Sequence, residues 1–131
     1  MSRPRLLIAD DQEAMRFFFK LLAEADCEVV GEAENGQEAV EAAERLRPGL
    51  LLMDISMPGM EGWEAVRLLR ERLPELRIMV ASGHAQRGYA DEALRLGVKA
   101  YLLKQAAPVE WPLALREVLA GGLFRSPQIP V

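Results

Sequence analysis

The chain has 131 residues, a length that fits one domain and excludes a second large one. Half of the residues are hydrophobic and 27% are charged, which argues against intrinsic disorder, and no apolar run approaches the roughly 18 residues of a membrane span. Sixteen basic and 20 acidic residues give a net charge of −4 without a basic cluster, and no signal peptide is visible. We therefore expect a cytoplasmic protein that contacts neither nucleic acid nor membrane directly.

Apolar segments of strand length alternate five times with amphipathic segments of helix length, which is typical of parallel βαβ units. The expected strands are 5–9, 27–32, 50–53, 77–81 and 100–103, and the expected helices are about 12–25, 36–46, 61–72, 88–96 and 109–120. Pro112 would break a hydrogen bond of a helix that began at Pro108, so we predict that the last helix begins late or is distorted there. Residues 1–122 form the predicted domain, and residues 123–131 are predicted to be the start of a linker or a frayed tail.

Cysteine and histidine occur once each, as Cys27 and His84. One cysteine cannot form an internal disulfide, and the pair offers no zinc-site spacing, so we expect Cys27 to pack in the interior. The remaining chemistry is that of oxygen ligands.

Functional side chains follow the predicted strands. Asp10 and Asp11 end the first strand, Asp54 the third, Ser82 the fourth and Lys104 the fifth. The carboxyl ends of parallel strands meet at one edge of the sheet, and three carboxylates brought together there repel one another unless a cation neutralises them. Mg²⁺ is the natural candidate, since it accepts carboxylates and a carbonyl and keeps positions open for phosphate oxygens.

A carboxylate beside such an ion can also attack phosphorus. Asp54 is then the acceptor, Lys104 supplies a positive charge, and Ser82 supplies a hydroxyl donor. The alternative is that each acid is solvated or caps the next helix. That explanation suits a single residue better than five matched positions on four strands.

Four segments in this order resemble the receiver domain of bacterial response regulators. They are Leu7-Ile8-Ala9-Asp10-Asp11, Leu52-Met53-Asp54-Ile55-Ser56-Met57-Pro58-Gly59-Met60-Glu61-Gly62, Val80-Ala81-Ser82-Gly83 and Ala100-Tyr101-Leu102-Leu103-Lys104. The resemblance covers about residues 4–122. It implies a CheY-like, flavodoxin-like α/β fold, in which a doubly wound five-stranded parallel sheet has the order 2-1-3-4-5 and helices on both faces.

The resemblance also implies roles for individual residues. Asp54 would be phosphorylated by a sensor histidine kinase, in a reaction that the receiver itself helps to catalyse. Asp11, Asp54 and the backbone carbonyl of Ser56 would bind Mg²⁺, and Asp10 would act through a metal-bound water. Ser82 and Lys104 would contact the phosphoryl group, and Tyr101 would turn inward as Ser82 moves. His84 lies at a variable position beside the phosphate; it either influences hydrolysis or is a solvent-facing loop residue.

The end of the chain resembles the NarL/FixJ group of transcriptional regulators, through Tyr101-Leu102-Leu103-Lys104, Gly121-Gly122 and Ser126-Pro127. In that group the tail leads into a DNA-binding domain. We therefore favour a truncated transcriptional regulator, whose own output domain would be a partner, over a single-domain receiver.

The first predicted helix contains Phe17-Phe18-Phe19, which cannot all face the core at about 100° per residue. We predict that Phe17 or Phe18 is partly exposed, and that Gln12, Met15 and Phe18 dock the kinase or form a homodimer contact, although Phe18 could instead be core. Trp111 is expected either on the output face or, more simply, as a buried anchor of the last helix.

Three other functions remain open. An aspartyl-phosphate phosphatase or transferase would carry a second Asp where Ser56 stands. A flavodoxin-type flavin domain would need a phosphate loop after the first strand, where this chain has Asp10-Asp11-Gln12-Glu13. A pseudo-receiver would bind partners without being phosphorylated.

Overall fold

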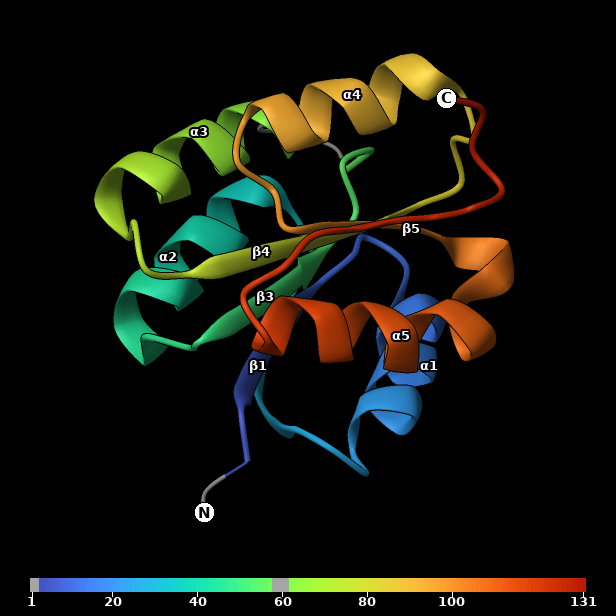
Figure 1. The fold of residues 1–131 in the computed structure, drawn as a ribbon. Helices are drawn as coiled ribbons and strands as arrows, with labels where there is room; N and C mark the ends of the chain where they lie inside the picture. Colours follow the sequence, from blue (N-terminus) through green and yellow to red (C-terminus); the bar gives the residue numbers. More distant parts are fainter. Residues whose placement is uncertain (1–2, 58–61) are drawn as a thin grey trace.

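The computed structural model describes residues 3–57 and 62–131, in which strands and helices alternate as predicted (Figure 1). The strands are β1 (Arg5–Ala9), β2 (Glu28–Ala33), β3 (Leu50–Met53), β4 (Arg77–Ser82), β5 (Ala100–Leu103) and β6 (Phe124–Arg125). The helices are α1 (Glu13–Ala23), α2 (Gly36–Leu46), α3 (Gly62–Arg72), α4 (Arg87–Arg95) and α5 (Ala107–Leu119), and a 3₁₀ turn over Lys104–Ala106 leads into α5. None of the helices in these described ranges is long and apolar enough to cross a bilayer.

The strands form one sheet in the order β2-β1-β3-β4-β5-β6, and every neighbouring pair is parallel. The predicted order of the first five strands is confirmed, and β6 is an addition to the edge of β5. The strand order reverses between β1 and β3, so the carboxyl ends of these two central strands open onto the crevice where this class of fold binds its ligands.

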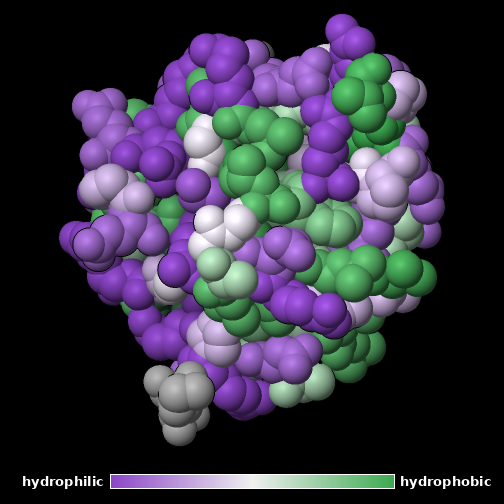
Figure 2. Space-filling model, in the orientation of Figure 1, coloured by the Kyte–Doolittle hydropathy of each residue, from purple (hydrophilic) through white to green (hydrophobic). Residues whose placement is uncertain are grey.

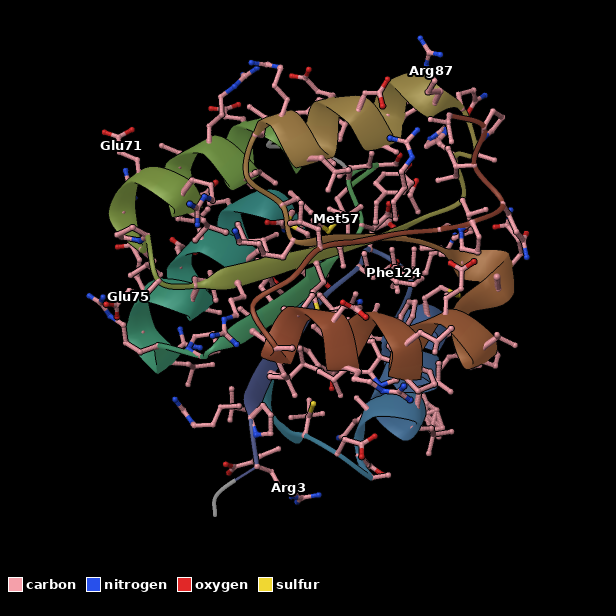
Figure 3. All side chains as sticks on the ribbon, in the orientation of Figure 1. Arg3, Met57, Glu71, Glu75, Arg87 and Phe124 are labelled. Atoms are coloured by element: carbon pink, nitrogen blue, oxygen red, sulfur yellow. The ribbon has the colours of Figure 1, made fainter. Side chains whose placement is uncertain are left out.

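Alternate residues of the central strands face opposite layers, as the two-residue period of a strand requires. Leu7, Leu51 and Val80 pack with α2, α3 and α4. Ile8, Leu52 and Ala81 pack with α1 and α5. Figure 1 shows these two groups of helices on opposite sides of the sheet. In Figure 3, Met57 lies in the layer beneath α4, and Phe124 lies on the side of α5.

The start of the last helix differs from the prediction. α5 begins at Ala107 and continues through Pro112, so the expectation of a late start is wrong. Both Pro108 and Pro112 are exposed, and water can therefore hydrogen-bond the carbonyl that Pro112 leaves without a donor. The opposite face of α5 buries Trp111 and Ala114, and this packing outweighs the loss of one hydrogen bond.

The C-terminal segment, residues 123–131, also differs from the prediction of a frayed tail. Residues 124–125 form β6, and Ser126 and Ile129 are buried. The physical reason is the edge of β5, which would otherwise present unpaired backbone groups that this segment now satisfies. A two-residue strand is too short to leave a periodic pattern in the sequence.

Candidate functional site

The register of the sheet brings the predicted acids together. Ala9 pairs with Met53, so Asp10 and Asp54 leave neighbouring strands at the same level, and the Asp54 N–H donates to the Ala9 carbonyl at 3.0 Å. Carboxylate oxygens of Asp10, Asp11 and Asp54 lie within 4.8 Å of one another. Asp10 and Asp54 are buried and Asp11 is exposed, so the cluster opens to solvent on one side.

Lys104 joins the two buried acids. It follows β5, and its Nζ lies 2.7 Å from Asp10 Oδ2 and 2.9 Å from Asp54 Oδ2. Burial alone would lower the pKa of Lys104, but the hydrogen bonds to both carboxylates outweigh it and raise that pKa. Burial raises the pKa of Asp10 even though Lys104 and the Gln12 N–H favour its ionised form. One ammonium therefore only partly offsets the cost of the negative charge collected here.

Asp54 is held through both carboxylate oxygens. Oδ2 accepts from Lys104, and Oδ1 accepts the backbone N–H of Ser56 at 3.0 Å. Gly62 at the start of α3 lies against the Ile55 backbone, and only glycine fits there because a Cβ would lie 2.4 Å from the Ile55 Cα. The segment Pro58-Gly59-Met60-Glu61 of the resemblance motif lies outside the described residues.

Ser82, His84 and Tyr101 form a hydrogen-bonded group beside the acids. Ser82 Oγ accepts the His84 N–H at 3.0 Å, and the Tyr101 hydroxyl donates to the His84 carbonyl at 2.8 Å. Tyr101 is fully buried, and this burial raises its pKa. His84 Nε2 lies 3.1 Å from Ser56 Oγ, and its ring stacks on Tyr89 with centroids 4.2 Å apart. His84 is therefore no free loop histidine: it connects the loops after β3 and β4.

Two neighbours of the site carried no recognisable signal in the sequence. Arg16 donates to the Asp10 carbonyl at 2.8 Å while pairing with Glu32, and Tyr89 supplies the stacking face for His84. Both lie on helices, where an arginine or tyrosine without a motif around it is unremarkable. Only the folded arrangement shows that their side chains reach the site.

The remaining predicted residues lie outside the acidic cluster, except that the Gln12 backbone N–H donates to Asp10 Oδ1 at 2.9 Å. Cys27 is buried in the core, and burial raises the pKa of its thiol to about 11, so it is no nucleophile. Trp111 is a buried anchor of α5. Gln12 is exposed, whereas Met15 and Phe18 are half-buried against the core. Among the three phenylalanines of α1, it is Phe17 that projects outward, at 55% exposure.

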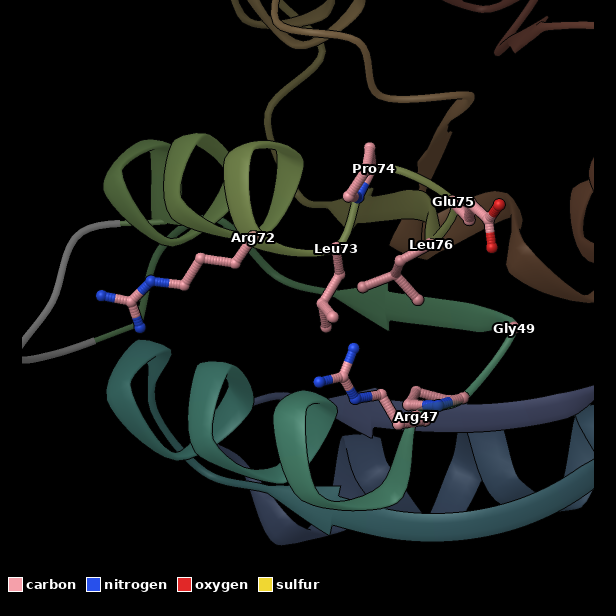
Figure 4. Close-up of a pocket in the computed structure, with 8 residues that line it drawn as sticks. Arg47, Gly49, Arg72, Leu73, Pro74, Glu75 and Leu76 are labelled. Carbon is pink, nitrogen blue, oxygen red and sulfur yellow. The ribbon is translucent and has the colours of Figure 1, made fainter.

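A cavity of about 430 Å³ lies at the opposite end of the sheet (Figure 4). It is bordered by the turns that precede β3 and β4, including Arg47, Gly49, Leu73 and Leu76. The acidic cluster, in contrast, lies where these strands end. The site residues predicted from the sequence therefore lie away from this cavity.

The sequence of this chain is similar to that of a known protein family. Residues 6–116 match the sequence profile described as "Response regulator receiver domain". The chain belongs to the response regulator receiver family. Members of this family take part in two-component signal transduction, and they typically bind Mg²⁺ at an acidic pocket such as the one formed by Asp10, Asp11 and Asp54.

Curated relatives include a transcriptional regulatory protein, a response regulator and a chemotaxis protein. The transcriptional regulatory protein DegU of Brevibacillus brevis is 35% identical over 98% of this chain and 55% of its own length. Response regulator GacA of Pseudomonas viridiflava is 35% identical over 95% of the chain and 59% of its own length. The chemotaxis protein CheY of Thermotoga maritima is 38% identical over 87% of the chain and 96% of its own length. This receiver thus spans between half and three fifths of the two regulators.

Solved structures agree with the fold. The isolated receiver domain of RcsB from Salmonella enterica serovar Typhimurium, solved with the phosphomimetic BeF₃⁻, aligns with a TM-score of 0.91 at 26% identity, covering 98% of this chain and 96% of that one. A LuxR-family response regulator from Aurantimonas sp. SI85-9A1 gives 0.92 at 31% identity, covering 98% and 93%. The structural neighbours of this chain thus include a LuxR-family regulator and also the receiver domain of NarL from Mycobacterium tuberculosis, in line with the NarL/FixJ resemblance at the end of the sequence.

Proposed function

We propose that this receiver accepts a phosphoryl group on Asp54 from the phosphohistidine of a sensor kinase and uses it to switch the interactions of a transcription regulator. The observation that best supports this proposal is the environment of the Asp54 carboxylate. Lys104 holds one of its oxygens, the Ser56 N–H holds the other, and two further acids lie beside it. Hydrogen bonds to both of its oxygens hold the Asp54 carboxylate in one orientation, as a nucleophile requires.

In the proposed transfer, an Asp54 oxygen attacks phosphorus as the bond between phosphorus and the kinase imidazole breaks. The imidazole nitrogen keeps the bonding electron pair and takes up a proton. Lys104 pairs with Asp54 before the transfer and with the phosphoryl oxygens after it. The Ser82 hydroxyl, at the end of the strand between β3 and β5, donates to the same oxygens.

The donors at the acidic cluster fit Mg²⁺. We assign Asp11, Asp54 and the Ser56 backbone carbonyl as its ligands and Asp10 as a ligand through water. Carboxylate oxygens within 4.8 Å of one another, open to solvent at Asp11, suit an ion that retains several waters. When bound, the ion neutralises charge on the phosphoryl oxygens.

The signal would leave the pocket through Ser82 and His84. If Ser82 turns toward a phosphoryl group, the His84 N–H loses its acceptor. The same histidine accepts a hydrogen bond from the Tyr101 hydroxyl at its carbonyl and stacks its ring on Tyr89. Tyr89 belongs to α4, so a local change reaches that helix and β5. We propose Tyr101 and Ser82 as the switch residues on this ground.

We propose three kinds of partner. The input partner is a sensor histidine kinase docked at Gln12, Met15 and Phe18; of these, only Gln12 is fully exposed, and Phe17 adds the projecting ring. The output partner is a DNA-binding domain of the same protein, because this receiver covers about half of DegU, a transcriptional regulatory protein. A second receiver is the third partner, since RcsB, a structural neighbour, has been solved as dimers on DNA.

Incubation with Mg²⁺ and acetyl phosphate, followed by intact-mass measurement, tests the assignment. Wild type should gain one phosphoryl group, Asp54→Asn should gain none, and Lys104→Ala should gain it far more slowly. Asp26→Asn, which removes an exposed acid remote from the pocket, is the matched control and should behave as wild type. A wild type without an adduct would make the chain a pseudo-receiver, and an adduct on Asp54→Asn would move the acceptor elsewhere.

A further inference from the structure

The most unusual buried group outside the acidic cluster is Glu110 on α5. It is 2% exposed, and none of the ion pairs within the described residues includes it. Two neutral donors satisfy its carboxylate instead. Oε1 accepts the Leu103 backbone N–H at 3.1 Å, and Oε2 accepts the Ser126 hydroxyl at 2.6 Å. A buried carboxylate is costly without donors, so each of the two contacts offsets part of the cost of burying Glu110.

The position of Glu110 follows from the edge of β5. In a parallel strand every second residue directs its backbone groups to the same neighbour. The Phe124 N–H donates to the Lys99 carbonyl and the Ser126 N–H to the Tyr101 carbonyl, both at 2.9 Å. β6 ends there, one step short of Leu103. Glu110 therefore takes the place of the missing strand residue and completes the edge.

This edge ends directly at the reacting pocket. Leu103 is the residue before Lys104, whose Nζ reaches Asp10 and Asp54. The backbone that Glu110 fixes is thus the base from which the Lys104 side chain extends. A continuous set of hydrogen bonds and covalent neighbours runs from Ser126 to Glu110, Leu103 and Lys104.

We propose that Glu110 is a positioning residue for Lys104, and that through Ser126 it couples the C-terminal segment (residues 123–131) to the acidic pocket. The inference rests on the proposed function, because it concerns the same lysine. When the segment detaches, Glu110 loses the Ser126 hydroxyl, one of its two donors. Its carboxylate then turns toward water and no longer accepts the Leu103 N–H. By linkage, a change at Lys104 alters the docking of the segment by the same factor.

The C-terminal segment is held at a second point, by contacts of Arg125. Arg125 lies 2.6 Å from Asp91 on α4 and donates to the Pro130 carbonyl at 3.0 Å. Figure 1 shows the segment crossing from α5 along β5 toward α4. Figure 2 shows apolar and polar residues mixed on this face of the molecule. The segment is held by the polar contacts of Ser126 and Arg125 and by the packing of Phe124 and Ile129 against the core.

Amide hydrogen exchange at Leu103 tests the positioning role without any phosphoryl group. Ser126→Ala and Glu110→Ala should speed exchange of the Leu103 amide roughly tenfold, as the loss of one buried hydrogen bond predicts. Glu110→Gln should restore near wild-type exchange, because its carboxamide oxygen accepts from Leu103 and its NH₂ group donates to the Ser126 hydroxyl. Gln128→Ala and Glu117→Gln, which change exposed side chains of the same segment and helix, should leave it unchanged.

A second measurement reads Lys104 itself. The rate of adduct formation from acetyl phosphate should fall roughly tenfold in Ser126→Ala and recover in Glu110→Gln. Faster exchange at Phe124 with unchanged exchange at Leu103 would overturn the coupling, and equal acceleration at Leu7 and Leu51 would reduce it to general destabilisation. If wild type forms no adduct, the proposed function fails, and exchange at Leu103 still decides whether Glu110 holds this backbone.

Discussion

At the residue scale, the pocket is governed by how one lysine is shared between two buried acids. Asp10 is 2% exposed, and its burial raises the pKa of its carboxyl despite a 2.7 Å contact with Lys104. A charge that remains costly after pairing is retained for chemistry and lowers the stability of the fold. Asp10 is thus a residue at which the demands of the site and of stability oppose each other.

This conflict predicts that Asp10→Asn stabilises the metal-free protein at neutral pH. In wild type the carboxyl is neutral in both folded and unfolded states below its ordinary pKa of 3.8, and it becomes destabilising as pH rises through the higher folded-state pKa. The variant should therefore be more stable by about 1 kcal/mol at pH 7, with no difference in acid. Urea unfolding in EDTA across pH measures this.

Glu13→Gln is the control for the Asp10 prediction, since it removes one negative charge from an exposed side chain three residues further along the chain. It should leave the free energy of unfolding nearly unchanged at all pH values. A gain in Asp10→Asn that persisted into acid would show that packing, and not ionisation, limits the wild type.

Residue chemistry could be predicted where it coincides with strand ends. Asp10, Asp54 and Lys104 follow apolar runs, and the parallel sheet then fixes their meeting point. The contact between His84 and Tyr89 and the role of Glu110 could not be predicted. Each depends on the angle at which a helix packs, which the hydrophobic pattern does not specify.

At the scale of elements, the alternation of strands and helices predicted a parallel sheet and the resemblance to receiver domains supplied its strand order, but two features were not predicted: β6 and the course of α5. β6 is too short to show a period, and it forms because the edge of β5 is available. α5 continues through Pro112 because its buried face, with Trp111 at the centre, stabilises the helix by more than one missing hydrogen bond costs. In both places tertiary contacts override a local signal.

Pro112→Ala should accordingly raise the stability of the protein. Alanine restores an N–H that can donate to the Pro108 carbonyl, and its exposed position requires no repacking. The expected gain is about 1–3 kcal/mol in the free energy of unfolding, measured by urea denaturation. Pro108→Ala, in the first turn where no intrahelical donor is needed, should give little. Equal effects at the two prolines would show that α5 carries no strain at Pro112.

At the scale of the whole molecule, negative charge gathers at the carboxyl end of the sheet, where the number of carboxylates exceeds the number of positive side chains that pair with them. Asp10, Asp11 and Asp54 gather at the carboxyl ends of β1 and β3, and Lys104 at the end of β5 pairs with two of them, Asp10 and Asp54. This arrangement exists only in the folded chain, because Asp54 lies 43 residues after Asp11 in the sequence. A divalent cation that binds there must therefore stabilise the fold by mass action.

Mg²⁺ should raise the melting temperature of wild type progressively, equivalent to about 2.7 kcal/mol at a concentration one hundred times its dissociation constant. Asp11→Asn should abolish most of this rise and slightly raise the metal-free melting temperature, because it removes a ligand and a repulsion together. Glu13→Gln should respond to Mg²⁺ as wild type does, and NaCl of equal ionic strength should not reproduce the effect. An equal rise in wild type and Asp11→Asn would mean that the cation acts by general screening and that the three carboxylates form no specific site.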